Sequence, residues 1–269
     1  MKLNHITTKS DIINLFQKLG IKKGANVFVH SSLSSLGYVV NGALDVIDAL
    51  IQIIDTKSGT ILMPAHSGQL TDPINWKAPA IKKELIDIVK TNMRPFNKKV
   101  TPIRGRGVIP ESFFRYPNIE RSNHPLNSVI AMGRLAKYFT QIHDLHAPEG
   151  LDSPIGRLYE KEGNILLVGV GLSRCTAIHL AEYLVDVSYL YESEIKVLTN
   201  KNGNNTFTKI KRYPNGSEHF DKLMPDLKKQ KLVKSVKYRN TELFYFNIKP
   251  VVDFAVAQLM NDKYYLINE

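Results

Sequence analysis

The order of apolar and polar positions predicts a chain in which strands alternate with helices. Residues 26–29, 60–63 and 165–168 each contain at least three consecutive apolar residues and are followed by polar or glycine-rich residues, which is typical of strands buried on both faces. Apolar residues recur at helical spacing over residues 12–19 and 44–54. This alternation predicts a mixed, largely parallel sheet with right-handed crossovers and flanking helices.

The pattern changes beyond residue 190. Residues 194–198 and 206–213 alternate between apolar and polar around Asn202-Gly203-Asn204-Asn205, which predicts a β-hairpin. Residues 241–246 read as a further strand, and Pro250 opens a final helix. These segments predict an antiparallel addition to the preceding α/β core.

The fold class that we expect is therefore α/β, organised as one domain over residues 1–269. Residues 1–190 would form the core and residues 191–269 the hairpin addition with the closing strand and helix. Within the core, residues 81–90 predict an amphipathic helix and residues 128–132 a strand.

Composition narrows the class of partner. The chain is 43% hydrophobic and 23% charged, as in ordinary globular proteins, and its formal net charge is +11. That charge favours an anionic partner, either nucleic acid, a membrane surface or a phosphorylated cofactor, although a solvated face explains the lysine-rich residues 222–237. The start of the chain is polar, and no apolar run approaches the roughly 18 residues of a membrane span. Together with a single cysteine, this predicts a cytoplasmic location.

Candidate chemistry follows the apolar run at residues 165–168. Gly169 and Gly171 end the run, and a helix should follow that carries Thr176, His179 and Glu182 at i, i+3 and i+6 along one side. In an open α/β sheet the carboxyl edge of the strands is where ligands bind. A hydroxyl, an imidazole and a carboxylate there would suit a general base with its supports. A hydrogen-bonded helix histidine without a catalytic role is the alternative, because spacing does not prove convergence.

Two other strands end in histidine-containing loops. The polar loop from His30 to Gly37 contains four serines, and such a backbone can approach a phosphate or an extended pantetheine-like chain. A serine-rich turn that caps the next helix is the alternative interpretation. His66 follows the strand at residues 60–63.

Other functions have weaker support. A metallohydrolase could use four of the histidines, but the pair His143-x-x-His146 completes no ligand motif with His66 or His179. A serine hydrolase would need a Gly-x-Ser-x-Gly elbow, which is absent, and no nucleic-acid-binding motif is present.

Six ordered motifs carry a resemblance to a known family. They lie at residues 30–42, 59–64, 110–111, 121–125, 152–154 and 176–182. Their succession, from about Ser10 to the carboxyl terminus, resembles the antibiotic acetyltransferases typified by aminoglycoside 3-N-acetyltransferases. The resemblance implies transfer of an acetyl group from acetyl-CoA to an amine, on a fold peculiar to this family and distinct from GNAT acetyltransferases.

The resemblance also implies roles for individual residues. His179 matches the catalytic histidine, and Thr176 a threonine close to the reacting thioester. Asp72, Glu182 and His66 are placed at the amine acceptor. Residues that match elements around coenzyme A are His30, Ser31, Ser32, Leu33, Ser34, Val40, Gly42, His124 and Ser128.

Two positions depart from the family pattern, and they affect the expected acceptor. Cys175 and Ala177 stand where many members carry asparagine and serine.

The implied reaction needs no metal, and Arg104 or Arg106 could meet the coenzyme A phosphates. The implied acceptor is the 3-amino group of the 2-deoxystreptamine ring of an aminoglycoside, with an amino sugar or another small amine as the alternative. We expect a monomer or homodimer that binds neither nucleic acid nor membranes.

Overall fold

The computed structural model describes residues 5–185, 193–201, 204–212 and 216–267. Its strands are β1 (Ile6–Thr7), β2 (Asn26–Ser31), β3 (Tyr38–Val39), β4 (Thr60–Pro64), β5 (Glu120–Arg121), β6 (Val129–Gly133), β7 (Asn164–Val168), β8 (Ser193–Lys201), β9 (Asn204–Arg212), β10 (Lys234–Tyr238) and β11 (Thr241–Asn247). Its α-helices are α1 (Lys9–Leu19), α2 (Ala43–Ile54), α3 (Ile86–Asn92), α4 (Val108–Phe113), α5 (Ala136–Thr140), α6 (Pro154–Glu160), α7 (His179–Leu184), α8 (Met224–Lys229) and α9 (Ile248–Asn261).

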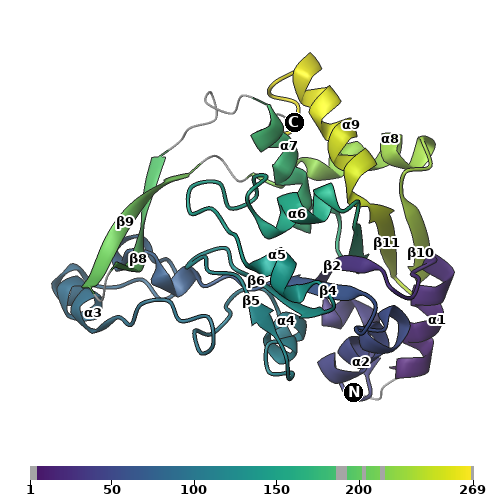
Figure 1. Ribbon diagram of the computed structural model, residues 1–269, viewed down its shortest axis with the longest axis horizontal. Helices are drawn as coiled ribbons and strands as arrows, with labels where there is room; N and C mark the ends of the chain where they lie inside the picture. The colour runs from purple at the N-terminus through teal and green to yellow at the C-terminus, as the bar shows by residue number, and fades with distance from the viewer. Residues whose placement is uncertain (1–4, 186–192, 202–203, 213–215, 268–269) are drawn as a thin grey trace.

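A seven-stranded sheet in the order β10-β11-β7-β2-β4-β6-β5 forms the centre of the described chain (Figure 1). Strands β7, β2 and β4 pair in parallel, whereas β6 pairs antiparallel with β4, and β11 antiparallel with β7. The outer strands β5 and β10 again pair antiparallel with their neighbours, so only β6 and β11 run against the direction of the others. The expected mixed α/β sheet with a parallel centre is confirmed. The single-domain organisation of residues 1–269 stays a prediction.

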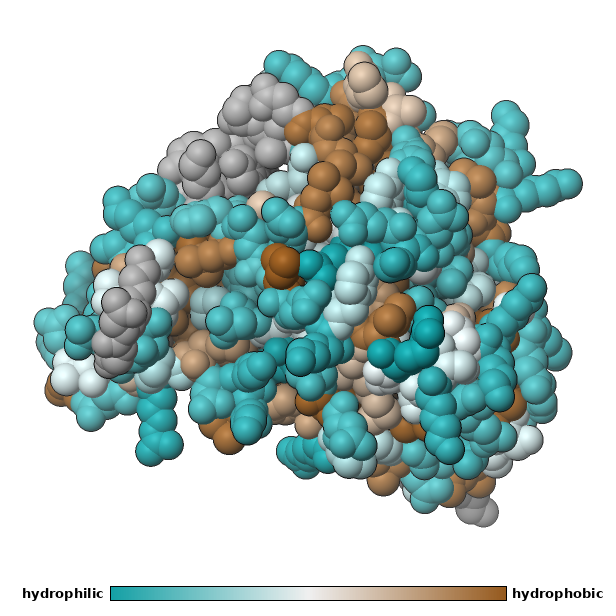
Figure 2. All heavy atoms as spheres, in the orientation of Figure 1, coloured by the Kyte–Doolittle hydropathy of each residue, from teal (hydrophilic) through white to brown (hydrophobic). Residues whose placement is uncertain are grey.

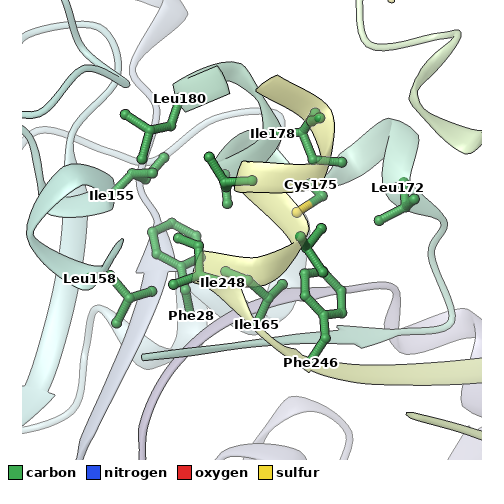
Figure 3. Close-up of a cluster of buried hydrophobic side chains, with 14 of the residues drawn as sticks. Phe28, Ile155, Leu158, Ile165, Leu172, Cys175, Ile178, Leu180, Phe246 and Ile248 are labelled. Carbon is green, nitrogen blue, oxygen red and sulfur yellow. The ribbon is translucent and has the colours of Figure 1, made fainter. Parts of the chain in front are cut away.

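The strand β7 shows why its sequence is apolar throughout. Ile165 and Leu167 contribute to a core that helices α5, α6, α7 and α9 cover, whereas Leu166 and Val168 contribute to a core beneath α1, α2 and α4. Both faces of the strand are therefore buried, and period-two alternation of polarity is lost. Figure 3 shows part of the first core, with Cys175 beside the helix α9.

The ends of helix α1 follow from its sequence. The Thr8 hydroxyl accepts a hydrogen bond from the Asp11 backbone N–H at 3.2 Å, and the Asp11 carboxylate accepts one from the Thr8 N–H at 2.9 Å. Gly20 ends the helix in the left-handed region at φ 81°. The helix therefore begins with a capping box and ends at a glycine, as these residue types favour.

The predicted helix over residues 81–90 begins too early. Residues 83–85 form a 3₁₀ turn, and α3 runs from Ile86 to Asn92. Of the apolar residues in this segment only Ile86 is buried, and the Ile88 side chain is 61% exposed. The apolar periodicity therefore has little core to pack against, and it does not extend the helix.

The predicted hairpin forms, but it does not join the central sheet. Strands β8 and β9 pair antiparallel over Ser193–Lys201 and Asn204–Arg212 as a separate two-stranded sheet. The expected turn residues Asn202 and Gly203, and Tyr213, lie outside the described residues. The antiparallel strands that do extend the central sheet are β10 and β11.

The face of the molecule in Figure 2 is mainly hydrophilic, with hydrophobic side chains gathered in separate patches. Among the described residues, no helix combines the length and the apolar character that crossing a bilayer requires.

Candidate active site

The candidate site lies at the carboxyl ends of the three parallel central strands. β2 ends at Ser31, β4 at Pro64 and β7 at Val168, so the loops that follow them leave from the same edge of the sheet. After β7, the chain makes 3₁₀ turns at residues 172–174 and 176–178 before α7 begins at His179. The expected helix therefore starts later than the sequence predicts, and its histidine is the first α-helical residue.

His179 and Glu182 form a buried pair. The imidazole Nδ1 lies 2.7 Å from the Glu182 carboxylate oxygen Oε2, and both side chains are less than 10% exposed. The Phe220 ring packs edge-on against the imidazole at 4.8 Å between ring centroids. Because Nδ1 is occupied by the carboxylate, Nε2 is the nitrogen left for proton exchange with a ligand.

The Glu182 carboxylate raises the basicity of this imidazole. Burial alone lowers the pKa of His179, but the charge and hydrogen bond of Glu182, with a smaller effect of Glu149, outweigh burial and leave the pKa above its usual value. The second Glu182 oxygen, Oε1, is buried without a hydrogen-bond partner. The sequence could not say which acid orients His179, and the structure identifies Glu182.

Thr176 lies beside His30 from the neighbouring strand. The Thr176 hydroxyl and His30 Nε2 are 3.4 Å apart, and the His30 ring stacks on Phe28 with centroids 4.9 Å apart. Burial, with a further effect of Arg106, lowers the pKa of His30 to about 3. His30 is therefore neutral near pH 7 and can orient the threonine hydroxyl without adding a charge.

The first of two clefts, of about 840 Å³, lies along the loop after β2. It is lined by five of the residues expected at coenzyme A, namely His30, Ser31, Ser32, Leu33 and Ser34. Gly169 and Val170 line it from the end of β7. Val40 and Gly42 do not line it, and Gly42 instead precedes α2 next to the Leu33 side chain.

Gly169 in this cleft has a backbone that alanine would strain. Its φ is +64°, and an added Cβ would overlap the Ser35 hydroxyl, which donates a hydrogen bond to the Ser32 carbonyl at 2.6 Å. We expect Gly169→Ala to lower the free energy of unfolding by about 1–3 kcal/mol. Urea denaturation measures this change, and Gly68→Ala is the matched control because its Cβ would meet open space. Equal stability of the two variants would show that a side chain at residue 169 causes no strain.

The second cleft, of about 370 Å³, contains the imidazole. Thr176 and His179 line it from the segment after β7, His66 from the loop after β4, and Glu149 from the opposite loop. Ile195 and Ile210 of the β8–β9 hairpin form part of its wall. Arg106 and Arg174 line both clefts, so the two spaces adjoin beside Thr176 and His30.

Two residues expected near coenzyme A support the walls of the site instead. His124 Nδ1 accepts hydrogen bonds from the backbone N–H groups of Leu126 and Asn127, at 3.1 and 2.8 Å, and these two residues line the second cleft. Ser128 donates to the Ala65 carbonyl at 2.6 Å. Both side chains are buried outside the clefts, so this geometry favours a structural role, and their contact with a cofactor stays a prediction.

Asp72 is not brought to the site. Its carboxylate pairs with the Lys90 ammonium at 2.9 Å and accepts a hydrogen bond from the Ile74 N–H at 3.2 Å. The side chain is buried in that arrangement and lines neither cleft. Its expected role at the acceptor stays a prediction that the geometry does not favour.

Glu149 is a site residue that the sequence did not reveal. It is buried in the second cleft, where Asn127 Nδ2 donates a hydrogen bond to its Oε1 at 2.7 Å. Burial is the main reason why the pKa of Glu149 is raised, while His179 and Asn127 act in the opposite direction. The one available signal was its place three residues before the Asp152-Ser153-Pro154 motif.

Other expectations concern side chains near the reacting centre. Cys175 lines the second cleft but is also packed in the core, and burial raises the pKa of its thiol to about 12 (Figure 3). Ala177 is likewise buried. Of the two arginines considered for phosphate binding, Arg106 lines both clefts and Arg104 lines neither.

A histidine metal centre finds no support in the geometry. Within the described part of the chain, no group of three or more His, Cys, Asp or Glu side chains could hold a metal ion. Both ring nitrogens of His143 are already hydrogen-bonded, one to the Ser122 hydroxyl and the other to the Pro148 carbonyl, each at 2.8 Å.

Comparison with known proteins decides the family. A family model described as aminoglycoside 3-N-acetyltransferase matches residues 28–260. The chain belongs to the aminoglycoside 3-N-acetyltransferase family. It is therefore an enzyme of the acyltransferase class, as the resemblance implied.

Individual relatives agree with this assignment. The SPbeta prophage-derived aminoglycoside N(3')-acetyltransferase-like protein YokD of Bacillus subtilis is 35% identical over 256 residues, covering 95% of this chain and 93% of the relative. Its crystal structure matches with a TM-score of 0.89 at 34% identity, over 99% of this chain and 97% of YokD. Aminoglycoside N(3)-acetyltransferase III of Pseudomonas aeruginosa is 27% identical over 262 residues, covering 96% and 95% of the two chains.

The same fold occurs in a further solved structure. The apoenzyme of aminoglycoside acetyltransferase AAC(3)-IVa matches with a TM-score of 0.85 at 26% identity, over 100% of this chain and 94% of that chain. The expected antibiotic N-acetyltransferase fold, distinct from GNAT, is thus confirmed.

Proposed function

We propose that this enzyme transfers the acetyl group of acetyl-CoA directly to an amine of a small-molecule acceptor, with His179 as the general base. The observation that carries the proposal is the buried His179–Glu182 pair, in which His179 lines the second cleft and Glu182 holds the imidazole from behind. The first cleft can hold the donor and the second the acceptor, so that the two substrates meet beside Thr176 and His179.

The reaction follows from the groups at this junction. The neutral His179 Nε2 accepts a proton from the amine nitrogen as that nitrogen attacks the thioester carbonyl carbon. The tetrahedral intermediate carries its negative charge on oxygen, and in this proposal the Thr176 hydroxyl, which lines the second cleft, donates a hydrogen bond to it. The C–S bond then breaks, and the imidazolium returns its proton to the leaving thiolate. Products are the amide and free CoA, and no acetylated enzyme forms.

The first cleft suits the donor by its shape and lining. Its volume is about 840 Å³, and Ser31, Ser32 and Ser34 in its lining offer hydroxyl and backbone groups to an extended chain. Acetyl-CoA is a cosubstrate here, and the proposed chemistry needs no metal ion because His179 supplies the base.

The family suggests the acceptor. The matching family model describes acetylation at the 3-amino position of aminoglycosides, and a related structure shows a histidine-to-alanine variant of AAC(3)-IVa in complex with apramycin, at 26% identity and a TM-score of 0.78. We therefore propose the 3-amino group of a 2-deoxystreptamine ring as the family-based acceptor, with an amino sugar or another small amine as the second candidate. A cytoplasmic location and a monomer or homodimer remain parts of this proposal.

The decisive experiment measures CoA release from acetyl-CoA with a panel of aminoglycosides, amino sugars and simple amines. We expect turnover with at least one amine, no CoA release without an acceptor, and an unchanged mass of the protein. A burst of CoA without acceptor together with an acetylated protein would contradict direct transfer. Absence of turnover with any amine, in an enzyme that binds acetyl-CoA, would contradict the proposed acceptor class.

A further inference from the structure

Two arginines lie at the junction of the clefts, and neither is ion-paired with a described carboxylate. Arg106 and Arg174 each line both clefts, and no carboxylate of the described residues forms an ion pair with either guanidinium. The Arg106 Nε is buried and has no hydrogen-bond partner. A guanidinium donor that is buried without an acceptor is costly, so it indicates a place for a ligand oxygen.

The backbone around Arg106 is built to present this side chain. Gly105 and Gly107 on either side have φ of +71° and +86°, conformations that other residues rarely adopt, and neither has a neighbour that would confine a Cβ. Arg106 also acts electrostatically on groups from three other segments, since it lowers the pKa of His30 and His66 and acts on Glu149. It therefore lies centrally among the groups of the site.

The charges of the two arginines oppose each other. Burial is the main reason why the pKa of Arg106 is lowered, and the positive charge of Arg174 lowers it further, whereas Glu149 compensates in part. An anion between the guanidinium groups would relieve this repulsion and supply acceptors to both.

Acidic side chains are few in the described lining of the acceptor cleft. Glu149 is the one carboxylate among the described residues that line it, because Glu182 lies behind His179 and Asp72 is paired with Lys90. Two guanidinium groups face the same space. The described lining therefore offers an aminoglycoside, which carries several ammonium groups, a single carboxylate as partner.

We propose that Arg106 and Arg174 bind an anionic substituent of the acceptor, so that the physiological substrate is a small amine carrying a phosphate, phosphonate or carboxylate. This inference rests on the proposed acetyl transfer, and of the two acceptor candidates proposed above it selects the amino sugar or other small amine over the aminoglycoside. Glu149 would then bind the ammonium end before deprotonation, and the arginine pair would hold the anionic end, which orients the amine toward His179.

The phosphates of coenzyme A are the other source of an anion for this pair. The pantetheine arm separates the thioester from those phosphates along an extended chain. The arginines lie next to Thr176 and His30, where the thioester would react, so a donor bound for transfer has its phosphates farther along the first cleft. The acceptor is therefore the source to which we assign the anion.

The test compares amines that differ by one anionic group. We would measure kcat/KM for ethanolamine against phosphoethanolamine and for glucosamine against its 6-phosphate, with gentamicin as the polycationic acceptor. Each series would be run with acetyl-CoA and with S-acetylpantetheine, which lacks the nucleotide phosphates. We expect the phosphorylated amine to be favoured by about tenfold or more, as one charge-assisted pair provides.

Matched variants assign the preference to residues. Arg106→Met and Arg174→Met should each reduce the phosphate preference with both donors, whereas Arg104→Met removes the same charge two residues away, outside both clefts, and should keep it. Arg174 is exposed, so its variant keeps the test valid if Arg106→Met fails to fold.

Several outcomes would overturn the inference. Turnover of the amines that lack a phosphate at the same kcat/KM as their phosphorylated counterparts, or fastest turnover with gentamicin, would overturn it while the proposed acetyl transfer stands. If Arg106→Met and Arg174→Met raise the KM for acetyl-CoA but not that for S-acetylpantetheine, and leave the preference for phosphorylated amines unchanged, the arginines bind the donor. If no amine reacts, the CoA-loaded enzyme should still bind phosphoethanolamine by calorimetry, and absence of binding would also overturn the inference.

Discussion

Replacement of His179 by alanine is expected to lower kcat by about 10²–10⁴-fold, because the amine would lose its general base. The imidazole Nε2 faces the second cleft, and Nδ1 is held by Glu182 at 2.7 Å, so the carboxylate can stabilise the imidazolium that forms on proton uptake. Burial, by contrast, lowers the pKa of the other histidine in this cleft, His66. The first cleft does not include His179, and the dissociation constant for acetyl-CoA should therefore remain within a small factor of the wild-type value.

The measurement is steady-state CoA release with the best acceptor, together with calorimetric titration of acetyl-CoA. His146→Ala is the matched control, since this histidine is exposed on a loop and lines neither cleft. Turnover by His179→Ala within a factor of a few of the wild type would remove His179 from the mechanism. Lost acetyl-CoA binding in the same variant would instead show that the histidine supports the donor site.

Glu182→Gln is expected to lower kcat by about 10- to 100-fold, the loss that follows when a hydrogen bond to a charged group is removed. The carboxylate is the nearest partner of the imidazole and stabilises its cation, which forms when the amine proton is taken up. Glutamine keeps the size of the side chain but not its charge. The effect should appear mainly in kcat, because Glu182 does not line the acceptor cleft.

The same variant should shift the pH profile in a defined direction. The base works when neutral, so kcat/KM of the wild type rises as the pH increases through the raised pKa of His179. Without the carboxylate charge, burial dominates and lowers that pKa, so the acidic limb moves to lower pH. A pH series of kcat/KM measures this shift, with Glu242→Gln as control, because Glu242 pairs with Lys228 on the surface. A limb that keeps its position would show that Glu182 does not tune His179.

The strands were the part of the fold that residue pattern predicted best. β7 has to be apolar at every position because each of its faces contributes to a separate core, and this requirement is visible without coordinates. The helix expected over residues 81–90 forms only from Ile86 onward, for the complementary reason. Its apolar spacing was correct, but Leu85 and Ile88 are largely exposed, so packing did not support the pattern.

The candidate site likewise has features that the sequence predicted and features that only the structure shows. Spacing along one segment placed His179 and Glu182 on the same side of a helix, and the structure shows them in contact. Spacing could not show that Thr176 meets His30, 146 residues earlier in the chain. It also could not show that the Asp72 carboxylate is already bound to Lys90.

By itself, the sequence determined the alternation of strands and helices along the chain, the buried character of the strands and the local relation of His179 to Glu182. These features depend on period and on neighbours within one or two turns of chain. Only the tertiary structure decided that Glu149, Arg106 and Arg174 converge on the clefts and that Asp72, His124 and Ser128 lie outside them. The physical reason is that such convergence depends on how loops from distant strands pack at one sheet edge, which local periodicity does not encode.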